Sequence, residues 1–63
     1  MEKRYKVETN EGHRFFKTVK SAREYFFECK EREVYTELWL HLYDSQHDVY
    51  SSISELLDVY DPR

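Results

Sequence analysis

Three histidines, a single cysteine and a group of acidic residues are the side chains that could take part in catalysis or bind a metal. Nucleophilic catalysis needs a serine or cysteine beside a histidine. Cys29 falls on the apolar side of an expected helix, where a thiol behaves as a small hydrophobic group. Asp44, His47 and Asp48, joined by His41, offer ligands that suit zinc or manganese, but their spacing matches no metal motif. We therefore predict that the protein is not an enzyme and uses no cofactor.

Residues 34–43 carry the strongest binding signal, because they alternate between two apolar sets. Successive side chains of a β-strand point to opposite faces. One face would carry Val34, Thr36, Leu38, Leu40 and Leu42, and the other Tyr35, Glu37, Trp39, His41 and Tyr43. In so short a chain one face can serve the core, so the other would present aromatic side chains to a partner.

A β-hairpin is predicted at the start of the chain. Residues 4–9 and 13–19 alternate as strands do, and residues 10–12 between them end in the only glycine, Gly12. This spacing suits a three-residue loop with glycine in the left-handed conformation. Tyr5 and Val7 would face the core. We place Arg14 and Phe16 on the opposite face, beside the aromatic set of residues 34–43.

A helix is predicted from Ser21 to about Arg32. Ser21 and Glu24 form a capping box, in which the serine is the N-cap and the glutamate reaches back to it. The apolar residues Ala22, Tyr25, Phe26 and Cys29 then lie along one side of the helix. They should pack against the leucine face of residues 34–43.

The C-terminal third fits two structures. Residues 44–48 are rich in turn formers. We expect a short extended entry at 48–50 and a second helix over about 52–60, because Val49, Ile53, Leu56, Leu57 and Tyr60 follow a 3.6-residue period. The alternation at 49–53 also allows a short fourth strand. The predicted fold is therefore a single α+β domain, residues 1–63, in the order β-β-α-β-α, with the helices on one face of a small antiparallel sheet.

Size and charge limit the environment and the partners. A chain of 63 residues has a marginal core, and one cysteine cannot form an internal disulfide. No apolar run approaches the roughly 20 residues of a membrane span, and no secretory signal is evident, so we expect a cytoplasmic protein. Residues 1–32 carry a net charge of +3 and residues 33–63 a net charge of −6. Such asymmetry can steer a charged partner.

We predict a protein-binding module. Eleven of the 63 residues are aromatic, more than so small a core needs, and Tyr, Trp and Arg are enriched in interfaces. The predicted partner-binding residues are Tyr35, Trp39, His41, Tyr43, Arg14 and Phe16. An acidic patch of Asp44, Asp48, Asp58 and Asp61 would engage a basic partner. A homodimer is also expected, formed through the aromatic face or by edge-to-edge pairing of residues 34–43.

Two alternatives remain open. The same sheet face, with Arg4 and Lys6 added, could stack bases and hold the phosphates of a single-stranded nucleic acid, although Glu8 and Glu37 oppose this. The C-terminal segment could instead fold over this face and bury it. In size and style the chain resembles accessory proteins of bacteriophages, including inhibitors of host defence enzymes. The resemblance covers no defined motif and assigns no residues; it implies an inhibitor that occupies a surface of a larger host protein.

Overall fold

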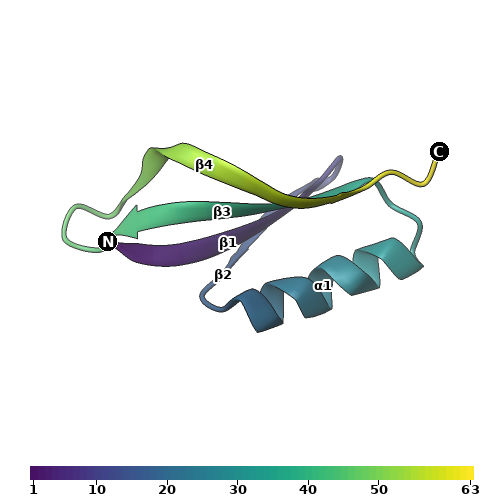
Figure 1. Ribbon diagram of the computed structural model, residues 1–63, viewed down its shortest axis with the longest axis horizontal. Coiled ribbons are helices and arrows are strands. Elements are labelled where there is room, and N and C mark those ends of the chain that lie inside the picture. Colours follow the sequence, from purple (N-terminus) through teal and green to yellow (C-terminus); the bar gives the residue numbers. More distant parts are fainter.

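Four strands and one helix make up the fold of the computed structural model, which describes residues 1–63. The strands form one antiparallel sheet in the order β2-β1-β3-β4, and the helix packs on one face of it (Figure 1). In chain order the elements are β1 (Glu2–Thr9), β2 (Gly12–Phe16), α1 (Val19–Glu31), β3 (Thr36–Asp44) and β4 (Val49–Tyr60). The predicted mixture of a helical layer and a small antiparallel sheet is confirmed.

The predicted hairpin is β1 and β2, but its loop is shorter than expected. Thr9 pairs directly with Gly12, so only Asn10 and Glu11 form the turn. The Thr9 hydroxyl accepts a hydrogen bond from the Glu11 amide (3.1 Å). Gly12 has a φ of +138°, a conformation that side chains with a Cβ rarely adopt. The glycine is therefore the first residue of β2 and not the last residue of the loop.

The helix begins earlier than its predicted capping box. Thr18 is the N-cap: its backbone is extended, and its hydroxyl oxygen accepts a hydrogen bond from the Ser21 amide (3.2 Å). Ser21 is therefore the third residue of the helix and not its cap. An N-cap oxygen bonds the amide two or three residues ahead, a role that Thr18 fills as well as serine can. At the other end, the helix ends at Glu31, one residue before the predicted end, and Arg32 is its C-cap.

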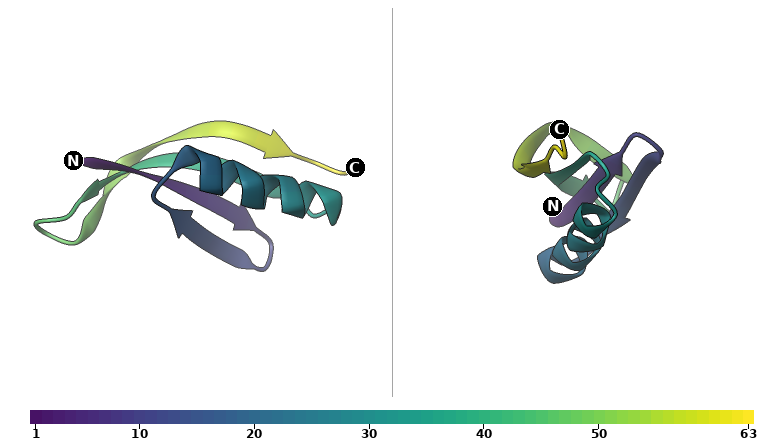
Figure 2. Two further views of the ribbon diagram at one scale, coloured as in Figure 1. Left: turned by 90° about the horizontal axis from the view of Figure 1, so that it is seen from below. Right: turned by 90° about the vertical axis from the view of Figure 1, so that its right-hand side faces the viewer.

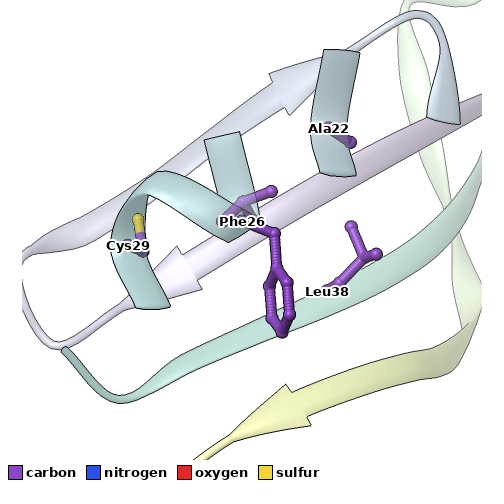
Figure 3. Packing of buried hydrophobic residues seen from close by; sticks show 5 residues of the cluster. Ala22, Phe26, Cys29 and Leu38 are labelled. Atoms are coloured by element: carbon purple, nitrogen blue, oxygen red, sulfur yellow. The ribbon is translucent and has the colours of Figure 1, made fainter. Parts of the chain in front are cut away.

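The core lies between α1 and the centre of the sheet (Figure 3). Val7 of β1 and Leu38 of β3 pack against the predicted helix side, of which Ala22, Phe26 and Cys29 are buried. These five residues are the whole set of fully buried hydrophobic side chains. The helix covers only part of the long sheet, and the end that carries the β3–β4 turn extends beyond it (Figure 1). The packing of the helix on the leucine face is confirmed for Leu38, but Leu40 and Leu42 lie outside this core, which is therefore small.

The second predicted helix is wrong: residues 49–60 form the long strand β4, so the order is β-β-α-β-β. The pairing of β4 with β3 shifts register twice, between Leu38 and Trp39 and between His41 and Tyr43. Each shift adds unpaired residues to β4, which breaks the two-residue alternation. The apolar residues are consequently spaced by three or four positions, which is the spacing that imitates a helix.

The topology also overturns two expectations for residues 34–43. β3 is a central strand, hydrogen-bonded to β1 on one side and β4 on the other, so its edges are unavailable for pairing with a second copy. The C-terminal segment lies beside β3 within the sheet and does not fold over its aromatic face (Figure 1). The single helix, α1, is too short and too polar to cross a membrane.

Candidate binding face

The sheet face opposite α1, here called the open face, carries most of the predicted binding residues. Lys6 pairs with Phe15 of β2 and with Trp39 of β3, which places these three side chains on one side of the sheet. The same registers assign the remaining members. The open face consists of Glu2, Arg4, Lys6, Glu8, His13, Phe15, Glu37, Trp39, His41, Tyr43, Tyr50, Ser54, Leu56 and Val59.

Arg14 and Phe16 do not lie on the open face, which corrects their predicted position. Arg14 pairs with Val7 and Phe16 with Tyr5, so both face the helix side. A hairpin loop of three residues would have placed them as predicted, whereas the observed loop of two shifts the register by one and reverses the faces of β2. Phe15 takes their place. A loop length of two residues, read from the sequence, would have placed Phe15 on the open face.

Four aromatic rings gather on the open face, and we call them the aromatic cluster: Phe15, His41, Tyr43 and Tyr50. Phe15 stacks on Tyr50, with ring centroids 4.4 Å apart and planes inclined by 21°. Phe15 also meets the edge of His41 (5.7 Å), and Tyr43 lies 5.0 Å from Tyr50. Phe15 and Tyr50 belong to strands at opposite edges of the sheet, which would be roughly 14 Å apart in a flat sheet. The two rings can meet only because the sheet is twisted and curled, as Figure 2 shows.

Trp39 is held in place beside the aromatic cluster by a carboxylate. Its indole Nε1–H donates to Glu37 (2.9 Å), and the Tyr35 hydroxyl donates to the other oxygen of the same carboxylate (2.9 Å). These two hydrogen bonds, first that of Trp39 and then that of Tyr35, lower the pKa of Glu37. The bond to Glu37 raises the pKa of Tyr35. Tyr35, Glu37 and Trp39 thus form a preoriented unit, with Tyr35 exposed and Trp39 half-buried.

His41 sits at the centre of the aromatic cluster without a hydrogen-bond partner. Both its ring nitrogens are shielded from solvent, and neither contacts a donor or an acceptor. Burial lowers the pKa of His41, and the charge of nearby Lys6 lowers it further. The imidazole is therefore neutral near pH 7. A buried polar group without a partner costs free energy, so this residue is held at the expense of stability.

The positive charges of the open face are paired with carboxylates. Arg4 forms an ion pair with Glu2 (3.1 Å), and its guanidinium lies over the ring of Tyr43 (4.9 Å). Lys6 forms an ion pair with Glu8 (3.1 Å). The guanidinium of Arg14, which would have added a further positive charge, lies on the other side of the sheet. The open face therefore combines aromatic surface with little uncompensated positive charge.

The four predicted acidic residues divide between the two ends of β4. Asp44 contacts His47 (2.7 Å), which lowers the pKa of the carboxyl, and Asp48 accepts a hydrogen bond from the Tyr43 hydroxyl. At the other end, Asp58 lies 3.8 Å from Arg23. Asp61 contacts Arg63 there (3.4 Å). No three potential ligands come close enough to hold a metal, and the structure does not bring the four aspartates together.

Comparison with known proteins gives no relative: the chain matches no protein family, no curated protein and no solved structure.

Proposed function

We propose that the protein is a small non-enzymatic binding module whose open face occupies a surface of a larger protein. The observation that carries the proposal is the uncovered sheet face, where Trp39 and Tyr35 stand beside the aromatic cluster. An inhibitor of bacteriophage type, which blocks a host protein by covering it, is the specific form of this proposal. The resemblance in size and style supports that form.

Trp39 is the proposed anchor of the interface. Tryptophan, tyrosine and arginine dominate the few residues that carry most of the energy of protein–protein interfaces. Glu37 already fixes the orientation of the indole ring, so little conformational freedom would be lost on binding. Tyr35 shares the Glu37 carboxylate with it, and Tyr43 and Tyr50, further along the same face, add rings that combine apolar area and a hydroxyl group.

Binding of single-stranded nucleic acid is the competing function, and charge argues against it. Affinity for phosphates depends on lysine and arginine side chains that release counterions. Arg4 and Lys6 already contact Glu2 and Glu8, and Glu37 adds a further negative charge to the same face. Titration with labelled oligonucleotides at two salt concentrations separates the two functions. Binding that is salt-sensitive and lost with Lys6→Glu would overturn our proposal.

The main test compares Trp39→Ala with a matched aromatic variant, Phe27→Ala. Phe27 is 57% exposed but lies on α1, away from the open face. A partner is first captured from the lysate of the native host, and its affinity for each variant is then measured by calorimetry. We expect Trp39→Ala to weaken binding by about 2 kcal/mol, roughly 30-fold, and Phe27→Ala to leave it unchanged. Equal losses in the two variants, or none in either, would contradict the proposal.

We also propose that the protein forms a homodimer. With β3 in the centre of the sheet, β4 is the long edge strand, and it carries five exposed apolar side chains. These are Val49, Tyr50, Ile53, Leu56 and Val59. Contacts between the β4 side chains of two copies would enlarge a core of only five buried hydrophobic residues. Tyr50, Leu56 and Val59 pair with open-face residues of β3, so the dimer contact and the proposed partner contact would share these three side chains.

A further inference from the structure

A hollow of about 250 Å³ lies on the helix side of the sheet, between α1 and the β1–β2 hairpin. The turn of this hairpin and the C-terminus of α1 lie at the same end of the molecule (Figure 1). Val7, Tyr25 and Val34 provide apolar walls, and Thr9 lines the hollow beside them. His13 is the one residue that the hollow shares with the open face; its other lining residues lie outside that face.

Arg14 lines this hollow with an unused guanidinium group. Its Cζ lies 5.3 Å from the ring centroids of both Phe16 and Tyr25, so two aromatic faces hold the group in position. It forms no ion pair and donates no hydrogen bond to the protein, whereas Arg4, Arg23, Arg32 and Arg63 all contact carboxylates. A guanidinium presents its donors in a planar fork that matches a carboxylate in a two-bond arrangement.

Arg32 supplies a second positive charge to the same hollow. Its Nη2 lies 3.5 Å from an oxygen of Glu11, and both side chains are more than half exposed. Exposed ion pairs of this kind are weak because solvent and salt screen them. An incoming anion can therefore compete with Glu11 for Arg32. His13 also lines the hollow.

We propose that this hollow binds one carboxylate group from an acidic segment of a protein partner. Arg14 would form the two-bond contact, and Arg32 would provide the second charge. The two arginines and one glutamate of the lining carry a net charge of +1, which a single carboxylate balances. A doubly charged phosphate group would carry more negative charge than this net charge of +1 can balance. The apolar walls suit the methylene groups of a glutamate side chain.

The test uses NMR titration of the isotope-labelled protein with a capped diglutamate peptide. A capped diglutamine peptide at the same ionic strength is the control for charge. We expect only the diglutamate peptide to shift the resonances of Gly12 and of the Arg14 and Arg32 side chains. Arg14→Gln should weaken the binding at least about tenfold, as loss of a charged hydrogen-bonding partner does. Glu11→Gln should tighten it, because the competing carboxylate is removed.

Matched variants separate specific binding from general attraction. Lys17→Gln removes the same charge at an exposed position outside the hollow, and should change the affinity by less than about twofold. Arg14→Lys retains the charge without the planar fork, and should fall between the wild type and Arg14→Gln. Trp39→Ala should bind the peptide normally, so failure of the open-face proposal would not affect this result.

Three results would overturn the assignment. The first is the absence of shifts with the diglutamate peptide. The second is a pattern of variant affinities that follows charge alone: either equal weakening by Lys17→Gln and Arg14→Gln, or full affinity in Arg14→Lys. The third is tighter binding of inorganic phosphate than of the diglutamate peptide at the same site. Should Arg14→Gln fail to give a folded spectrum, the comparison of Arg14→Lys with Lys17→Gln decides between the proposal and general attraction.

Discussion

His41 is the residue whose chemistry is most at odds with its surroundings. Phe15 and Tyr50 meet its ring, and neither nitrogen has a partner. An apolar ring would fill this position without unsatisfied polar atoms. We therefore expect His41→Phe to raise the free energy of unfolding by about 1 kcal/mol, measured by urea denaturation at pH 7.5. A destabilised variant would instead mean that the imidazole has a favourable polar contact.

The same residue should make stability depend on pH. Burial lowers the pKa of His41 below its ordinary value of 6.5, so as the pH falls the unfolded chain takes up a proton before the folded chain does. The part of the stability that depends on His41 staying unprotonated is complete above about pH 6.5 and is lost as the pH falls through the folded pKa. We expect wild-type stability to decrease between pH 7.5 and 5.5 more steeply than that of His41→Phe. Parallel curves for the two proteins would contradict this expectation.

At the scale of single elements, the start of the helix offers a direct test. Thr18 accepts a hydrogen bond from the amide of Ser21, and the Ser21 hydroxyl only accepts a bond from the Thr18 hydroxyl (3.0 Å). Thr18→Ala should lower the free energy of unfolding by about 1 kcal/mol. Ser21→Ala should cost less than about 0.5 kcal/mol, because it leaves the capped amide intact. Denaturant unfolding of both variants measures the difference, and the opposite order would restore Ser21 as the cap.

The elements also show which features the sequence could predict. The hairpin, α1 and β3 were all evident, because each shows a regular apolar period and a turn or cap at its end. The faces of β2 were not, because a loop one residue shorter reverses them. The strand β4 was predicted only as a short alternative at residues 49–53, and a helix was preferred, because two register shifts give its apolar residues a helix-like spacing. Local periodicity identifies regular elements, but register depends on pairing with distant strands.

Trp39 illustrates the same limit within the candidate site. Its place on the face opposite the helix followed from alternation along β3, and the structure confirms that position. Its hydrogen bond to Glu37 joins residues two apart on one strand face, and spacing alone could have suggested it. Phe15 and Tyr50, by contrast, meet across the whole width of the sheet. Only the curl of the assembled sheet brings those two rings together.

For the whole molecule, the surface area bears on the proposed dimer. The accessible surface is 4671 Å², above the roughly 4400 Å² expected for a folded monomer of this mass. Exposed apolar residues concentrate on β4, where Ile53 is 75% exposed. We expect the wild-type protein to sediment as a dimer at micromolar concentration and Ile53→Lys to sediment as a folded monomer. The reason is that a charge at the centre of an apolar contact would have to be desolvated.

Phe27→Lys provides the matched control for the dimer. Phe27 is also an exposed apolar residue, but it lies on α1 among charged neighbours that include Lys20 and Glu24. Introducing lysine there makes the same change in charge without touching β4. If β4 forms the contact, Phe27→Lys remains a dimer while Ile53→Lys does not. A monomeric wild type at every concentration, or dissociation by both variants, would show that the exposed side chains of β4 do not join two copies.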